Sequence, residues 1–65
     1  MKILRLKAVI EATGLSRSLI YKLIKQGTFP RSIALTGRAV GWPAHEVEAW
    51  VMARIEARDR RKSLA

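Results

Sequence analysis

A very short connection between two amphipathic segments constrains this chain more than any other feature. The first segment repeats its apolar side chains at the spacing of one helical stripe, at Leu6, Val9, Ile10 and Thr13. This pattern predicts a helix over residues 6–13, with Gly14 in a left-handed conformation just past its end. Only Gly14 and Leu15 lie between the end of this helix and Ser16, which is a good N-cap for a second helix. Two helices joined by so short a turn predict a helix-turn-helix.

The second segment, residues 16–26, has one apolar and one polar face. At about 100° per residue, the apolar face consists of Leu19, Ile20, Leu23 and Ile24. The opposite face carries Ser18, Tyr21, Lys22 and Lys25, with Arg17 at its edge. Gly27 ends this helix, and Pro30 prevents an immediate restart. Phe29, beside Pro30, is expected to be buried.

The next segment, SIALTGRAVGW over residues 32–42, predicts a β-hairpin. Gly37 and Arg38 suit the two central positions of a type II′ turn. The register that follows pairs Thr36 with Ala39, Leu35 with Val40, and Ile33 with Trp42. It gathers the large apolar side chains on one face of the hairpin, namely Ile33, Leu35, Val40 and Trp42. Arg38 then lies at the exposed tip, and Arg31 lies at the base.

A last helix is predicted from about Pro43 to Arg58 or beyond. Proline suits the first helical position, and the order of acidic then basic residues along the helix complements its dipole. The buried stripe is expected to be Val47, Trp50, Val51 and Ile55. Residues 1–58 thus form one domain, mainly α with a small β-hairpin, and residues 59–65 form a basic tail that frays. Trp42 and Trp50 both fall on apolar stripes, so we expect both indoles in the core.

The charge and hydropathy of the chain limit the kinds of partner that it can have. Thirteen Lys and Arg against five Asp and Glu give 65 residues a formal charge of +8, which favours a polyanionic partner such as nucleic acid. The chain has no long apolar run, so we expect no membrane association and a cytoplasmic, nucleoid-associated protein. The basic run RIEARDRRK, residues 54–62, is typical of a solvated helix end. A second phosphate contact or a partner-docking tail is the alternative.

Residue types that carry catalysis are scarce. The chain has no cysteine, His45 is its only histidine, and no carboxylate pair suggests shared acid–base work. Gly37 and Gly41 do not form the glycine-rich run that cradles phosphates. A metal site would need three or four ligands. We therefore expect no enzyme, no cofactor and no metal site.

The predicted elements together form the outline of a small winged helix-turn-helix domain whose second helix suits the major groove of double-stranded DNA. Arg17 can offer a bidentate guanidinium to a guanine or grip a phosphate, and Ser18 can bond to a base edge. Tyr21 offers a hydroxyl group and a ring that can pack on a sugar or a thymine methyl group. Lys22 and Lys25 suit phosphates, which position the protein without reading sequence. At the hairpin, Arg31 and Arg38 suit the adjacent backbone or minor groove.

Three pieces of the sequence carry a resemblance to a known family: TGLSRSLIYKLIKQGTFP, TGRAVGW and EVEAW. Over about Leu4 to Ile55, the chain resembles the AlpA family of small phage and prophage regulators, which are related to MerR-type DNA-binding domains and to phage excisionases. The resemblance implies a winged-helix fold that regulates transcription of mobile-element genes. It assigns the recognition-helix role to Ser16, Arg17, Ser18, Tyr21, Lys22 and Lys25. It assigns the wing role to Thr36, Gly37 and Arg38. Pro43 departs from the polar residue expected there.

Several alternatives remain open at this stage. Some relatives assist site-specific recombination, so an excisionase that bends attachment-site DNA for an integrase is the first alternative. A protein-binding inhibitor or adaptor, docking an acidic partner such as a subunit of RNA polymerase, is the second. RNA binding is less favoured because few aromatic side chains remain for stacking. One module buries only about 600–1,000 Å² on DNA, so several copies side by side or a dimer on DNA are expected.

Overall fold

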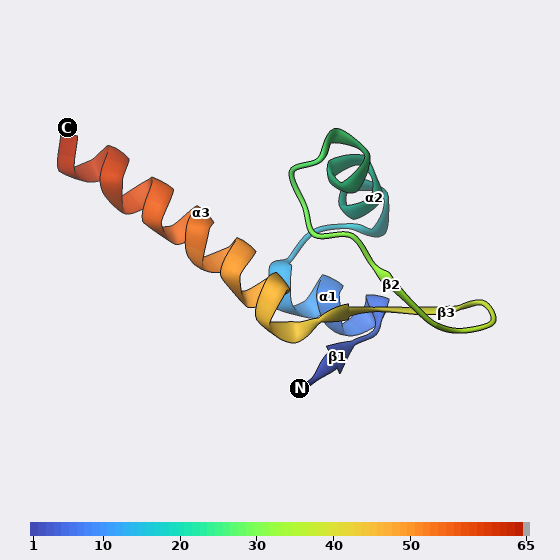
Figure 1. The fold of residues 1–65 in the computed structure, drawn as a ribbon. Helices are drawn as coiled ribbons and strands as arrows, with labels where there is room; N and C mark the ends of the chain where they lie inside the picture. The colour runs from blue at the N-terminus through green and yellow to red at the C-terminus, as the bar shows by residue number, and fades with distance from the viewer. Residues whose placement is uncertain (65) are drawn as a thin grey trace.

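Three helices and a small antiparallel sheet make up the fold (Figure 1). The computed structural model describes the backbone of residues 1–64 and the side chains of residues 1–61. In chain order the elements are β1 (Ile3–Leu4), α1 (Leu6–Thr13), α2 (Arg17–Gln26), β2 (Ile33–Thr36), β3 (Ala39–Pro43) and α3 (Ala44–Leu64). The three strands lie in the order β1-β3-β2. This arrangement is compatible with a winged-helix-like fold.

The connection between α1 and α2 has the predicted conformation. Gly14 has a φ of 74°, and its N–H group donates to the carbonyl oxygen of Ile10 at 2.8 Å. The side-chain oxygen of Ser16 accepts a hydrogen bond from the Leu19 N–H group at 3.2 Å, which makes Ser16 the N-cap of α2. Thr13 adds a bond from its hydroxyl group to the Val9 carbonyl at 2.8 Å. The first two helices therefore begin and end where the sequence predicted.

The end of α2 is also set by local signals. Gly27 has a φ of 80°, and its N–H group donates to the carbonyl oxygen of Ile24 at 3.0 Å. The next N–H group, that of Thr28, donates to the carbonyl oxygen of Leu23 at 2.9 Å. This pair of bonds is the Schellman motif, which a glycine accommodates without strain. It turns the chain sharply away from α2 and toward the sheet.

One small core lies where the helices meet the sheet. Its buried members are Val9, Ile20, Phe29, Trp42 and Val47. Trp42 has none of its surface exposed, and its Nε1 donates to the carbonyl oxygen of Pro30 at 3.0 Å. Trp50 is half-buried, donates from Nε1 to the Thr28 carbonyl at 2.7 Å, and meets the Phe29 ring edge-to-face at 5.0 Å. The expectation of a core position is confirmed for Trp42 and Phe29, whereas Trp50 is partly buried and packs against the core from its edge.

Two residues assigned to the apolar stripes lie at the edge of the core instead. Leu19 is 39% exposed and Ile55 is 38% exposed. The prediction that Ile55 is buried is wrong because helical periodicity defines a face but not the width of the surface that covers it. Leu19 lies at the margin of the face of α2 centred on Ile20. Ile55 lies one turn beyond the half-buried Val51 on α3.

The register of the hairpin differs from the predicted one. Thr36 pairs with Ala39 as expected, but Ala34 pairs with Val40 and Ile33 pairs with Gly41. A β-bulge at residue 35 places an extra residue in β2, and this shifts the remaining pairs by one. Ile33 and Leu35 consequently do not share a buried face with Trp42, since they are 43% and 41% exposed.

A third strand, which the sequence did not predict, lies against the outer edge of β3. Ile3 pairs with Pro43 and Leu4 pairs with Trp42. A Cβ atom added to Gly41 would lie 2.5 Å from Cγ2 of Ile3 and 3.2 Å from Cδ1 of Leu35. The missing side chain of Gly41 therefore lets Ile3 and Leu35 lie over β3. Two residues are too few for an alternating pattern, which is why β1 escaped prediction.

The entry into the last helix needs a correction of one residue. Pro43 ends β3, and α3 begins at Ala44, whose N–H group donates to the carbonyl oxygen of Lys2 at 2.8 Å. The helix continues beyond Arg58 to Leu64, through a run rich in the helix-forming residues Ala, Arg and Glu. The division into a domain at 1–58 and a tail at 59–65 stays a prediction. Residue 65 lies outside the described residues.

Within the described part of the chain, no helix has the length and apolar character needed to cross a membrane.

Candidate nucleic-acid interface

The polar face of α2 carries most of the predicted site residues, and all of them are exposed. They are Arg17, Ser18, Tyr21, Lys22 and Lys25, with Ser16 exposed at the cap. Ile20, on the other side of the same helix, is fully buried, so the helix cannot rotate about its axis without losing its core contact. The capped ends and the buried Ile20 hold this face in one orientation.

Tyr21 has a structural contact that sequence reasoning did not foresee. Its ring meets the ring of Trp42 edge-to-face, with 6.4 Å between centroids and 60° between planes. Edge-to-face pairs of this kind are favourable beyond the area they bury. The contact joins α2 to β3, so Tyr21 both presents polar surface and holds the helix against the sheet.

The tip of the hairpin presents Thr36, Gly37 and Arg38, all exposed. Gly37 has a φ of 48°, and none of the described non-glycine residues, Arg38 included, has a positive φ. A positive φ at the first central residue alone is the φ pattern of a type II′ turn, as predicted. Arg31, also exposed, precedes the base of β2.

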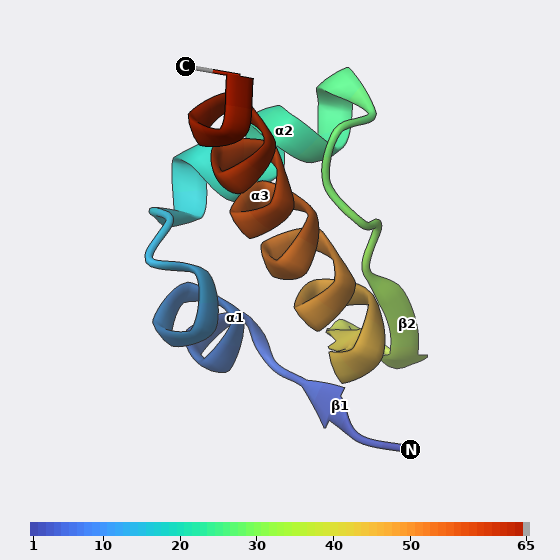
Figure 2. The same cartoon turned by 90° about the vertical axis from the view of Figure 1, so that its left-hand side faces the viewer.

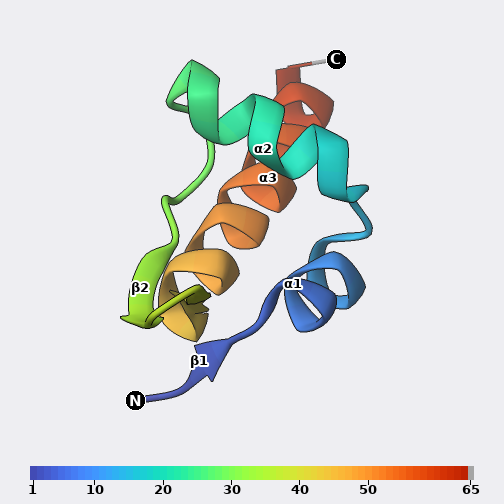
Figure 3. The ribbon, with the colours of Figure 1, turned by 90° about the vertical axis from the view of Figure 1, so that its right-hand side faces the viewer.

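The hairpin and α3 project in opposite directions, and α2 lies between them (Figure 1). Seen from the hairpin side, α2 lies in front of α3 (Figure 3). The structure therefore presents α2 and the hairpin together on the side of the molecule away from the C-terminal end of α3.

The cationic side chains of this surface are not engaged within the described part of the chain. No ion pair or side-chain hydrogen bond occupies Arg17, Lys22, Lys25, Arg31 or Arg38. Arg58 and Asp59 form an ion pair at 2.9 Å, but both residues belong to α3 and lie outside this surface. The positive charge of α2 and the hairpin is thus available to an external anion.

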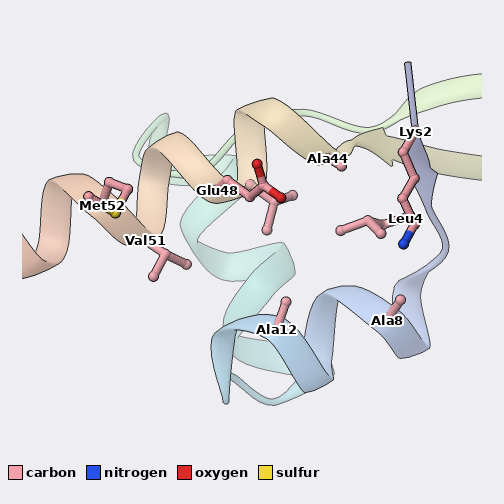
Figure 4. A pocket seen from close by; sticks show the side chains of 9 residues that line it. Lys2, Leu4, Ala8, Ala12, Ala44, Glu48, Val51 and Met52 are labelled. Atoms are coloured by element: carbon pink, nitrogen blue, oxygen red, sulfur yellow. The ribbon is translucent and has the colours of Figure 1, made fainter.

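A separate apolar cavity of about 460 Å³ lies between α1 and α3 (Figure 4). It is lined by Lys2, Leu4, Ala8, Ala12, Ala44, Val47, Glu48, Val51 and Met52. Lys2 and Glu48 are the ionisable residues of this lining, and its other members are apolar. Among the described residues, no cluster of His, Cys, Asp or Glu could hold a metal ion.

The family model for the prophage CP4-57 regulatory protein (AlpA) matches residues 2–55. The chain belongs to the AlpA family. The match covers β1, α1, α2, the hairpin and the first half of α3. It includes every predicted site residue on α2 and the hairpin, and it ends before the last turns of α3.

Two relatives support this assignment. A protein from Enterobacteria phage P4 named "Uncharacterized protein ORF88" is 46% identical over 59 residues, which cover 91% of this chain and 67% of the relative. The "DNA-binding transcriptional activator AlpA" of Escherichia coli (strain K12) is 37% identical over 60 residues, covering 83% of this chain and 86% of the relative. This AlpA-family chain is thus similar over most of its length to a transcriptional activator.

Ser16 offers a test of its structural role that is separate from any role at the interface. We expect Ser16→Ala to lower the free energy of unfolding by about 1 kcal/mol, because the Leu19 N–H group loses its acceptor. Ser16→Asp should keep the cap and the stability. Urea unfolding followed by circular dichroism would measure both variants. Equal stability of the alanine variant and the wild type would contradict the cap.

Proposed function

We propose that this chain is a sequence-specific double-stranded DNA-binding protein that regulates transcription of prophage or other mobile-element genes. The observation that carries the proposal is the exposed polar face of α2, held rigidly by two caps and the buried Ile20. Membership of the AlpA family and similarity to a protein named as a DNA-binding transcriptional activator support it. The formal charge of +8 supplies the sequence-independent attraction that such binding requires.

In this proposal α2 enters the major groove. The groove is about 12 Å wide and admits one helix. Arg17, in the first turn, reads a guanine with its guanidinium group, and Ser18 bonds to a neighbouring base edge. Tyr21 contacts sugar or a thymine methyl group, while its contact with Trp42 limits how far the ring can move. In this proposal the N-terminal half of α2 carries the sequence specificity.

The remaining candidates position the protein on the duplex. Lys22 and Lys25 bind phosphates beside the groove. The hairpin acts as a wing, in which Thr36, Gly37 and Arg38 contact the adjacent backbone or minor groove. Arg31 supports it from the base of the hairpin. These contacts add affinity and fix register but read little sequence directly.

The direct test is fluorescence anisotropy with a labelled duplex from the flanking region of the gene. A scrambled duplex of the same composition is the control, and both are titrated over a series of salt concentrations. Tighter binding to the native duplex that persists at moderate salt would support the proposal. Mapping the bound site then distinguishes a promoter from the attachment site that an excisionase would occupy. Equal, weak binding that disappears with salt would contradict sequence-specific recognition.

Lys25→Ala separates a phosphate contact from base reading. We expect this variant to bind every duplex more weakly by a similar factor, and the slope of log K against log salt to fall by about 1. Lys7→Ala is a matched control because Lys7 is an exposed lysine on α1, outside the proposed interface. A slope for the Lys25 variant equal to that of the control would remove Lys25 from the interface.

A further inference from the structure

The second half of α3 extends beyond the body of the molecule. The helix has 21 residues, which makes it about 31 Å long, and the whole molecule measures 49 Å along its longest axis. Val47 is buried and Trp50 and Val51 are half-buried, but every described side chain from Met52 to Arg61 is exposed. In Figure 2, the view from the side on which the C-terminus projects, α3 runs obliquely across the front of the molecule.

The charges on this half of α3 are separated by face. Arg54, Arg58 and Arg61 follow one another at spacings of four and three residues, so they lie within an arc of about 60°. Glu56 and Asp59 lie outside this arc. Trp50 precedes Arg54 by four residues and lies on the same face. The face of α3 that covers the core therefore continues as a row of arginines where the helix leaves the body, and we call these three residues the arginine row.

The arginine row begins beside the C-terminal end of α2. Trp50 donates from Nε1 to the carbonyl oxygen of Thr28 at 2.7 Å, and Thr28 is the second residue after α2. Arg54 follows one helical turn after this junction. The views in Figures 1, 2 and 3, which share a vertical axis, place both α2 and the end of α3 above the sheet. The row thus starts one helical turn after this junction and follows α3 as it projects away from the hairpin (Figure 1).

Two simpler roles account poorly for this row. Cations stabilise a helix through its dipole within the last turn, but Arg54 and Arg58 lie more than one turn before Leu64. An exposed ion pair such as that of Arg58 with Asp59 contributes little to stability. Among the described residues, the side chains of Arg54 and Arg61 have no hydrogen-bond or ion-pair partner. Neither role requires three arginines on a single face.

We propose that Arg54, Arg58 and Arg61 bind nucleic-acid phosphates and form a second contact region, separated from the wing by α2. Guanidinium groups bind phosphate oxygens through paired, charge-assisted hydrogen bonds. The inference rests on the proposed function, because it assumes that α2 already holds a duplex. The phosphates belong either to the same duplex, beyond the segment that α2 occupies, or to a second duplex. Both sources present the same chemistry to the row.

The test compares single arginine variants on and off the row. Arg54→Gln and Arg61→Gln each remove one charge from the row, and Arg60→Gln removes the same charge from another face of the same helix. Each lost phosphate contact should lower the slope of log K against log salt by about 0.9, whereas Arg60→Gln should leave the slope close to that of the wild type. Thermal unfolding followed by circular dichroism verifies that all three variants keep the wild-type helix content.

Two duplexes distinguish the two sources of phosphate. One is just long enough for α2 and the wing, and the other extends the same site on both sides. If the row variants lower the slope of log K against log salt on the long duplex but not on the short one, the contact belongs to the same duplex. Capture of a fluorescent second duplex by an immobilised protein–DNA complex, lost in the row variants but kept in Arg60→Gln, assigns it to a second duplex.

If the row variants have the same salt slope as Arg60→Gln on both duplexes and capture the second duplex equally well, this inference is overturned. The proposed function would remain intact. A wild-type protein that fails to prefer its own site would overturn the proposed function, and the inference with it.

Discussion

We expect Trp42→Ala to lower the free energy of unfolding by about 3–5 kcal/mol. Trp42 is the largest fully buried side chain, and truncation of such a residue has costs in this range. A domain of 65 residues has a total stability of roughly 3–10 kcal/mol at typical values per residue. The substitution also removes the hydrogen bond to the Pro30 carbonyl and the edge-to-face contact with Tyr21. The loss is therefore a large fraction of the total stability, and it falls on the contacts that join α2 to the sheet.

Urea unfolding followed by far-ultraviolet circular dichroism measures this effect. Ile55→Ala is a suitable control, since Ile55 is an apolar residue of α3 that is 38% exposed, and its truncation should cost much less. A Trp42→Ala protein that unfolds cooperatively at nearly the wild-type urea concentration would show that the core does not depend on this indole. The assignment of Trp42 as the centre of the core would then fail.

The second large effect concerns recognition. We expect Arg17→Ala to lose about 1–3 kcal/mol of binding free energy on the preferred site and to relax discrimination at one base pair. The reason is that a bidentate contact to a guanine has no equivalent at another base. Arg17 is exposed in the first turn of α2, so its removal should leave stability nearly unchanged. Anisotropy titrations against duplexes substituted at each position measure the effect.

Arg17→Lys refines this prediction. Lysine keeps the charge but lacks the planar fork, so this variant should retain the salt dependence of the wild type while losing part of the base discrimination. If Arg17→Ala instead weakens all duplexes by the same factor, Arg17 is a phosphate contact. Specificity would then have to come from Ser18 and Tyr21.

The elements that the sequence predicted correctly are those with local causes. Gly14 and Gly27 end their helices because both adopt positive φ values that other residues reach only with strain. Ser16 begins α2 because its side chain accepts a hydrogen bond three residues ahead. Each of these signals acts within five residues along the chain. The bounds of α1 and α2 could therefore be predicted without knowledge of the fold.

The hairpin shows where local reasoning fails. The predicted register gathered the large apolar residues on one face, but the bulge at residue 35 shifts Ile33 to a position opposite Gly41. The prediction assumed a two-stranded ribbon, whereas β1 adds a third strand on the far edge of β3. Ile3 and Leu35 both occupy the space over Gly41 that a side chain would otherwise fill. A partner strand this distant in the sequence leaves no trace in the pattern of β2.

The candidate interface was likewise predictable from the sequence only in part. The sequence by itself determined the residues on the polar face of α2 and at the hairpin tip, because helical period and turn chemistry are local properties. Only the tertiary structure decided that the Tyr21 ring rests against Trp42 and that the hairpin and α3 project on opposite sides of α2. It alone showed that the core-facing side of α3 becomes a row of arginines outside the body. These features depend on contacts between distant segments, whose free energies no short stretch of sequence encodes.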